Sequence, residues 1–535
     1  MKNWPAAAAI AVLTLLSFYQ FPGHTWLQQD SQIYVPILEH LRDPSVLAND
    51  ILVERPHVTF TLYDEIALGL RRVTGLGFRE ILESEQIVTR ALGIWGFYLL
   101  ATAVGLDTAA ALLVAAILSL GAMIAGPQVL IFEFEPVPRA FAVPLLVLAT
   151  GLAAHRRFLG AGIAGSSAFL IHAPTVYPFW AVYACYAVRL YSRKKNSADP
   201  VFHAFIPLIA AAAILFAGVR FQSGQSEAQD FFTRVTPLME KLQRMRTPYV
   251  WISTWWKQGL PHYLVLCAIA IGAWLRIRTR MTAELRFFVP GLVIAGVLSM
   301  PVSWLLLEQW KWALMPQLQP LRALLFVTLC AIFGAASAGC VAAEAHRYPE
   351  AFAWFAAAYL PSVNTSAISL PDWRRAAVIL LLALLACFAM RVGRIAVPVA
   401  AVAAFFLITF LGGVVNYPKL HTADLKQLAQ WARSSTPADA VFLFPNFGKD
   451  LSPGIFRAEA LRAVYVDWKG GGQVNYLREL GEQWWARWQV ADRLLSPAEY
   501  RDMGIDYVIV RSGTPFEPNI QPVFGNSHFV VHPVP

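Results

Sequence analysis

Apolar runs about as long as a bilayer is thick recur along most of this sequence, and no other feature restricts its possible folds so strongly. A helix needs about 20 mostly apolar residues to cross the hydrocarbon core of a membrane. The runs lie at 5–21, 87–104, 108–126, 139–154, 158–172, 174–191, 203–219, 261–276, 287–306, 321–342, 351–362, 375–390 and 394–414. We therefore predict a polytopic α-helical membrane protein with about 13 spans, in which 158–172 and 351–362 are short enough to be re-entrant or tilted.

Composition supports the same fold class. Of the 535 residues, 57% are hydrophobic and 14% are charged, whereas a soluble domain carries about 25% charged residues. Too few charges are present to cover several soluble domains, and this composition also excludes disordered chains and coiled coils. The five cysteines all lie in apolar runs without a CxxC pair, so we expect small buried side chains rather than metal ligands or disulfides.

The distribution of basic residues predicts the orientation. Lys and Arg gather on the cytoplasmic side of membrane helices, which explains much of the net charge of +9 without nucleic acid as a partner. With a cytoplasmic N-terminus, the inner loops hold Arg156, Arg157, Arg189, Arg193, Lys194, Lys195, Arg276, Arg278, Arg280, Arg286, Arg391 and Arg394, and Arg374-Arg375 is the main exception. We expect an uncleaved first helix at 5–21 and a C-terminus on the outer face of a bacterial inner membrane.

The chain divides by composition into two parts. Residues 1–414 form the expected membrane domain, with large outer loops at 22–86 and 220–260, and residues 415–535 resemble a soluble extracytoplasmic domain. Alternating and helical patterns predict a small α/β fold for this tail. The expected strands are 440–444, 463–466, 507–511 and an edge strand at 528–531, and the expected helices are 423–434 and 477–494. The glycines at 470–472 lack the spacing of a phosphate-binding loop.

Asp30 is the first candidate site residue, because it follows the first span and precedes an amphipathic stretch in the outer loop. A carboxylate held there is suited to act as a general base that activates an acceptor hydroxyl, or to bind a metal. Asp is also a favoured N-cap residue. Both interpretations stay open, and the two roles can coincide.

Glu133 and Glu135 lie in a short outer loop between apolar helices. Residues two apart in an extended segment point to the same side, so the two acids are candidates to share a metal or a proton. Asp30 and Glu135 are the candidate ligands of a divalent metal such as Mg²⁺ or Mn²⁺. Simple exposure to water is the alternative. Acids so close to a bilayer are costly, and this favours a functional role.

Arg90, Arg139 and Arg322 are each expected near the outer, N-terminal end of an inward-running helix. A cation there opposes the positive-inside bias and the helix dipole, and a phosphate held among them would reduce that cost. Pairing with a protein acid, as between Arg139 and Glu135, or snorkelling is the alternative. His172, which ends a span on the outer side, is a candidate phosphate ligand or acid/base, or an interfacial cap.

An outer first loop with Asp30 and a second outer loop with Glu133 and Glu135 resembles the GT-C superfamily of polytopic glycosyltransferases, and in particular an uncharacterised bacterial family related to it. The similar segments are Asp30–Gly105, Glu135-Pro136 with Arg139, His172, and the tail segments 439–442, 456–462 and 467–469. Two features depart from the superfamily: Gln28-Gln29-Asp30 replaces a paired acid, and the tail lacks a Trp-Trp-Asp motif.

This resemblance implies an inverting transfer of a sugar from a polyprenyl-phosphate donor to a glycan, lipid or protein of the cell envelope. By position, Asp30 would be the catalytic base, assisted by Glu133 or Glu135, and Arg322 or Arg139 would hold the lipid phosphate. A flippase or transporter for lipid-linked or anionic glycans is the alternative, and a non-catalytic envelope assembly protein is another. A transporter predicts charges toward the bilayer midplane, where we find few.

Overall fold

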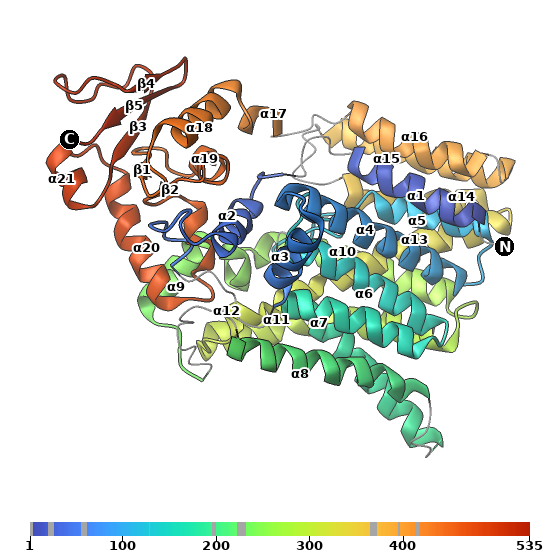
Figure 1. Cartoon of the computed structure of the whole chain (residues 1–535). Helices are drawn as coiled ribbons and strands as arrows, with labels where there is room; N and C mark the ends of the chain where they lie inside the picture. Colours follow the sequence, from blue (N-terminus) through green and yellow to red (C-terminus); the bar gives the residue numbers. More distant parts are fainter. Residues whose placement is uncertain are drawn as a thin grey trace.

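A bundle of long apolar helices carries a small α/β domain at one end (Figure 1). The computed structural model describes residues 4–19, 26–54, 61–127, 129–194, 200–221, 232–363, 372–393, 396–411 and 417–535. The bundle helices are α1 (Trp4–Tyr19), α4 (Phe78–Thr102), α5 (Thr108–Ser119), α6 (Pro138–Ala154), α7 (Phe158–Lys194), α8 (Phe205–Phe221), α10 (Trp256–Ile277), α11 (Ala283–Ser303), α13 (Leu324–Glu344), α14 (Tyr348–Val363), α15 (Asp372–Val392) and α16 (Ala396–Leu411).

Six helical segments within the described residues are long and apolar enough to cross a membrane: Phe158–Arg193, Pro200–Gly218, Trp256–Ile277, Ala283–Gln309, Met315–Glu344 and Asp372–Val392. Four shorter apolar helices, α1, α5, α6 and α16, accompany them. Met315–Glu344 is buried throughout its most apolar window, so its helix, α13, forms the centre of the bundle. The polytopic membrane fold is confirmed, and the number of crossings stays a prediction.

Helix α7 is two helical halves that fold back on each other at His172, whose backbone leaves the helical region (φ −155°, ψ 79°). The Phe158 ring packs against the ring of Tyr186, and Trp180 Nε1 donates to the Gly165 carbonyl at 3.4 Å. In one straight helix, Phe158 and Tyr186 would lie about 42 Å apart at 1.5 Å per residue. The two apolar runs on either side of residue 173 are therefore antiparallel neighbours, and His172 is at the tip between them.

Two amphipathic helices, α2 (Ser31–Arg42) and α3 (Tyr63–Thr74), lie between the bundle and the tail (Figure 1). The other short elements at this end are α9 (Pro237–Arg246), α12 (Met315–Leu318), the π turn η4 (Trp304–Gln309) and the 3₁₀ turns η2 (Pro248–Val250), η3 (Ile252–Thr254) and η5 (Pro320–Ala323). A 3₁₀ turn, η1 (Pro200–Ala204), precedes α8. The tail-side end of the bundle is thus built from the two large loops and the turn before α13.

The tail contains a five-stranded sheet in the order β2-β1-β3-β5-β4. Its strands are β1 (Val441–Leu443), β2 (Ala463–Val464), β3 (Tyr507–Arg511), β4 (Phe524–Gly525) and β5 (Phe529–Pro533). Strand β1 pairs in parallel with β2 and β3, and β5 pairs antiparallel with β3 and β4. Its helices are α17 (Tyr417–Leu420), α18 (Ala423–Ser435), α19 (Ser452–Ala460), α20 (Arg478–Ala491) and α21 (Pro497–Asp502), with a 3₁₀ turn η6 (Lys469–Gln473). The small α/β fold of the tail agrees with the prediction, but α19, α21 and β4 were not predicted.

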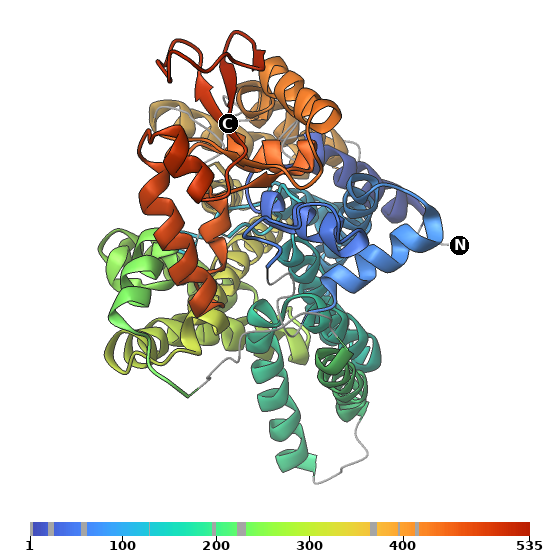
Figure 2. The same ribbon diagram turned by 60° about the vertical axis from the view of Figure 1, so that its left-hand side comes forward.

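One hydrophobic core contains residues of both the tail and the membrane part, so the tail packs against the bundle. It contains Val35 of α2, Phe141 of α6, and Phe442 and Phe456 of the tail. The tail and the blue loop helices meet in both views of the chain (Figures 1 and 2). Burial of such apolar surface contributes roughly 25 cal/mol per Å².

A fully buried ion triad reinforces this contact. Arg457 of α19 donates from Nε to Asp50 at 2.6 Å and from Nη2 to Asp467 at 2.7 Å, and all three side chains are at most 1% exposed. Asp50 belongs to the first large loop, so the triad connects that loop to the tail. Asp50 also accepts from the backbone N–H of Val464 at 2.8 Å. Burial of a charge is costly, but here each charge has an opposite partner.

Replacing Arg457 with methionine is expected to lower the free energy of unfolding by about 3–5 kcal/mol, because two buried carboxylates then lack their cation. Denaturant titration of the detergent-solubilised protein measures this change. Arg478→Ala is the matched control, since Arg478 pairs with Glu482 on the exposed face of α20 at 3.0 Å and such pairs contribute about 0–1 kcal/mol. Equal losses in the two variants would show that the triad does not stabilise the contact.

Candidate functional site

Asp30 stands at the N-cap position of α2, but its side chain makes no capping hydrogen bond. Glu135 satisfies the start of the helix instead: its carboxylate accepts from Gln29 N at 2.6 Å, from Asp30 N at 2.8 Å and from Ser31 Oγ at 2.6 Å. Three donors on one carboxylate hold the backbone of the loop tightly. Glu135 therefore positions Asp30 and leaves the Asp30 carboxylate free for other partners.

The Asp30 carboxylate lies between two cations from distant parts of the chain. Arg139 Nη1 is 2.9 Å from Oδ2, and Lys469 Nζ of the tail is 3.0 Å from Oδ1. Burial acts to raise the pKa of Asp30, but Lys469 and Arg139 together hold it well below its ordinary value. The Asp30 side chain is still 30% exposed.

Glu133 holds Arg139 in place. Its Oε1 is 2.6 Å from Arg139 Nε and accepts from Leu130 N at 3.1 Å. Glu133 and Glu135 thus bind different partners, although they were expected to point to the same side. Burial and the neighbouring Asp30 raise the pKa of Glu135 above its ordinary value.

A divalent metal does not fit these carboxylates as they are arranged. No group of three or more His, Cys, Asp or Glu side chains with metal-binding geometry occurs among the described residues. Both oxygens of Asp30 face cations, and both oxygens of Glu135 accept N–H or O–H donors. Hard divalent cations need several carboxylate or carbonyl oxygens at once, and the oxygens of Asp30 and Glu135 already have other partners.

Arg322 and His172 form a second cationic group at the same end of the bundle. Proline at position 320 starts η5, the turn that carries Arg322 just before α13. Arg322 Nη1 donates to His172 Nε2 at 2.8 Å, and His172 Nδ1 pairs with Thr175 Oγ1 at 2.8 Å. Arg322 is 7% exposed, and its Nε has no hydrogen-bond partner among the described residues. It retains a donor for a ligand.

Two partly buried tyrosines connect the groups around Asp30 with those around Arg322. Tyr34 of α2 and Tyr249 of η2 each interact electrostatically with Asp30, Arg139 and Arg322. Burial raises the pKa of both phenols above the ordinary value. Asp30, Arg139, Arg322 and His172, which are four of the predicted base and phosphate-ligand residues, therefore lie at the tail-side end of the bundle.

Arg90 lies apart from the free donor of Arg322. Helix α4 begins at Phe78 rather than near 87, so Arg90 is several turns into the helix. It donates to the Glu133 carbonyl and to Ser17 Oγ and lies over the Phe18 ring. These contacts occupy its guanidinium, and Arg90 supports the loop that contains Glu133.

The sequence analysis missed Lys469, Tyr34 and Tyr249. The stretch Asp467-Trp468-Lys469 had been noted as similar to a related family, but nothing in its local pattern pairs Lys469 with a residue 439 positions earlier. Tyr34 is four residues after Asp30, one helical turn away, and this spacing was the available signal.

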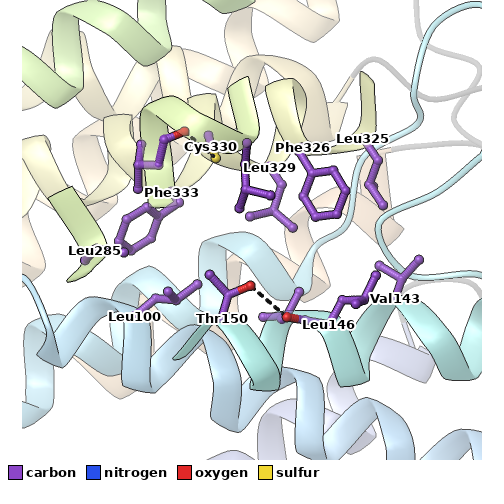
Figure 3. A pocket seen from close by; sticks show the side chains of 13 residues that line it. Leu100, Val143, Leu146, Thr150, Leu285, Leu325, Phe326, Leu329, Cys330 and Phe333 are labelled. Atoms are coloured by element: carbon purple, nitrogen blue, oxygen red, sulfur yellow. Dashed lines mark hydrogen bonds between the residues drawn. The ribbon is translucent and has the colours of Figure 1, made fainter. Parts of the chain in front are cut away.

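A pocket inside the bundle is a poor candidate site (Figure 3). Its lining, from α4, α6, α11 and α13, is apolar apart from Thr150 and Cys330. The Thr150 hydroxyl donates to the Leu146 carbonyl at 2.8 Å, and the Cys330 thiol lies 3.9 Å from the Val289 carbonyl. Its polar groups are satisfied within their own surroundings.

Comparison with known proteins identifies one family model and several solved structures. A domain of unknown function (DUF6798) matches residues 423–491 of the tail. No curated protein matches the sequence. The first structure is the Archaeoglobus fulgidus oligosaccharyltransferase tethered with an acceptor peptide, with 13% identity and a TM-score of 0.44 over 96% of this chain and 69% of that chain.

Two further structures align with the whole chain. Arabinofuranosyltransferase AftD from Mycobacteria has 15% identity and a TM-score of 0.47, and the alignment spans 40% of its length. ArnT from Cupriavidus metallidurans bound to undecaprenyl phosphate has 12% identity and a TM-score of 0.44, and the alignment spans 98% of its length. The three structures are an oligosaccharyltransferase, an arabinofuranosyltransferase and ArnT, and the likeness is one of fold.

The ion pairs of Asp30 predict how stability depends on pH. Since the folded-state pKa lies below the unfolded value of about 3.9, ionised Asp30 stabilises the fold at pH values above about 4, and this contribution is lost as the pH falls through the folded-state pKa. Wild type should therefore exceed Asp30→Asn in Tm near pH 7, with a gap that narrows below about pH 4. A gap that widens on acidification would contradict the assignment of Asp30 as an ionised, paired group.

Proposed function

We propose that this chain is a membrane glycosyltransferase that transfers a sugar from a polyprenyl-phosphate donor to an acceptor hydroxyl in the cell envelope. The proposal rests on one observation. The partly exposed Asp30 side chain lies at the same end of the bundle as Arg322, whose Nε–H has no hydrogen-bond partner among the described residues. In this proposal the N-terminus is cytoplasmic, and the tail lies on the outer face of a bacterial inner membrane.

The proposed reaction is a single displacement at the anomeric carbon. The acceptor oxygen forms a bond to that carbon, its proton passes to Asp30, and the bond from the carbon to the phosphate oxygen breaks. Polyprenyl phosphate leaves with the bonding electron pair. A positioned general base contributes about 10²–10⁴-fold to such a reaction, and the attack from the opposite face inverts the sugar.

Asp30 in its observed arrangement is a weak base, because Lys469 and Arg139 stabilise its ionised form. Arg139 is fixed by Glu133, whereas Lys469 lies on a turn of the tail. We infer that the acceptor displaces Lys469 from Asp30. The pKa of Asp30 then rises toward a value at which it accepts the hydroxyl proton.

The leaving phosphate requires cations that are already in place, since preorganised donors stabilise developing charge. Arg322 has an unused Nε–H, and its Nη1 is oriented by His172. Arginine binds phosphate oxygens through paired N–H groups. Arg322 is therefore the proposed main phosphate ligand, with His172 as its positioning residue and Arg139 as a second cation.

Asp30→Asn is expected to reduce kcat by about 10²–10⁴-fold, and Arg322→Ala by about 10²–10³-fold, the loss typical of a transition-state donor. The assay measures release of labelled sugar from a panel of polyprenyl-phosphate sugars by the protein in nanodiscs, with membrane extracts as acceptor. Arg478→Ala, on the exposed face of α20, should retain wild-type rates. Full activity in folded Asp30→Asn would refute the proposal.

Lys469→Met provides a separate test through the pH profile. Without the ammonium group, the pKa of Asp30 is expected to rise, so the acidic limb of kcat/KM against pH should move to higher pH. Lys449→Met is the matched control, since Lys449 lies over the Trp468 ring, whereas the cations paired with Asp30 among the described residues are Arg139 and Lys469. An unchanged acidic limb in Lys469→Met would show that Lys469 does not control the base.

A further inference from the structure

The tail segment 469–476 lies against the membrane part on the same side as Asp30. Lys469 pairs with Asp30 at 3.0 Å. Farther along, Asn475 Oδ1 accepts from Thr247 Oγ1 at 2.7 Å, and the Tyr476 hydroxyl accepts from Gln319 Nε2 at 2.9 Å. One continuous segment therefore spans from the proposed base to the turn before Arg322.

Three amide side chains at this contact have unused hydrogen-bonding atoms. Gln473 has no partner at either amide atom, Asn475 has none at Nδ2 and Gln319 has none at Oε1, among the residues that the structure describes. All three side chains are at most 4% exposed. Buried polar atoms are almost always paired in folded proteins, so this concentration of unpaired amides requires an explanation.

The backbone of this segment packs tightly against its neighbours, so poor packing does not explain why the amide atoms are unpaired. A Cβ added at Gly471 would lie 2.5 Å from the Trp484 ring, and one added at Gly472 would lie 2.6 Å from Ile33 Cδ1. Glycine at both positions lets the main chain approach its neighbours closely. The amides of Gln473 and Asn475 are thus presented by a well-packed segment.

The chemistry of the unused atoms matches hydroxyl groups. The unpaired Oε1 atoms of Gln473 and Gln319 are acceptors, whereas Gln473 Nε2 and Asn475 Nδ2 are donors. A sugar hydroxyl both donates and accepts, so neighbouring hydroxyls suit such a mixed set. A phosphate would need donors alone, and a metal would need acceptors alone.

We propose that Gln473, Asn475 and Gln319 recognise the hydroxyl groups of the transferred sugar. The inference rests on the proposed function and adds the residues that select the sugar. Because the unused atoms have no exposed surface, the sugar enters when the tail segment moves away from the bundle. That movement weakens the contact of Lys469 with Asp30, so binding of the sugar prepares the displacement of Lys469 by the acceptor.

The test compares Gln473→Leu and Asn475→Leu with wild type in nanodiscs. The probes are a short-chain prenyl phosphate and the same lipid phosphate carrying a hexose, a pentose or an amino sugar, and binding is followed by tryptophan fluorescence. Wild type is expected to bind one glycosylated probe at least about tenfold more tightly than the bare phosphate. Each variant should lose about tenfold for that probe and keep its affinity for the bare phosphate.

Two controls exclude misfolding. Gln489→Leu makes the same change on the exposed face of the neighbouring helix α20 and should bind as wild type. Leucine in place of an unpaired buried amide removes a polar group without a partner, so the Tm of Gln473→Leu should not fall. A lower Tm would show that the amide has a structural role and would overturn the inference.

Other outcomes separate this inference from the proposed function. If wild type transfers sugar but Gln473→Leu and Asn475→Leu bind the glycosylated probe normally, the inference fails and the proposed function stands. If the variants weaken both probes equally, the amides do not recognise sugar, and the inference fails too. If the variants lose the preference for the glycosylated probe and sugar transfer by wild type depends on Asp30, the inference and the proposed function are both supported.

Discussion

The electrostatic balance around Asp30 is the constraint on which the rest of this structure depends. A carboxylate recessed between a bilayer and a folded domain is costly unless cations accompany it. Arg139 comes from the start of α6 and Lys469 from the tail, so the balance exists only when the bundle and the tail are docked.

The buried triad of Arg457 with Asp50 and Asp467 maintains that docking. Asp467 is two residues before Lys469, and it also accepts from the backbone N–H groups of Lys469 and Gly470, so the same acid shapes the turn that carries Lys469.

The sequence predicted the parts of the fold that depend on local pattern. Apolar runs marked the helices, and short β-branched and aromatic stretches marked β1, β2, β3 and β5. The candidate site residues Asp30, Arg139 and Arg322 were chosen because each residue type is unusual for its place, and their roles stay predictions. Prolines 138 and 320 begin α6 and η5, so Arg139 and Arg322 both lie at the start of a helix or turn, as expected.

Long-range pairing was beyond sequence reasoning. Asp30 was recognised as a helix cap by position, yet Glu135, more than 100 residues away, makes the capping contacts. Arg90 was expected at a helix start because the apolar run begins near 87, but α4 extends back to Phe78 through a more polar segment. Lys469 and Gln473 lie in a glycine-rich turn with no motif, and only the docking of the tail brings them to the site.

In the observed structure, some interactions hold the tail against the bundle and others oppose that contact. The apolar core and the triad favour a seated tail, whereas the unpaired amides of Gln473, Asn475 and Gln319 oppose it, since each unpaired buried polar atom costs about 1–3 kcal/mol. A ligand that pairs these amides recovers that cost, so its binding energy offsets the loss of the ion pair between Lys469 and Asp30. Binding energy used in this way improves the base only when the sugar is present. An empty site would then keep Asp30 paired and unreactive.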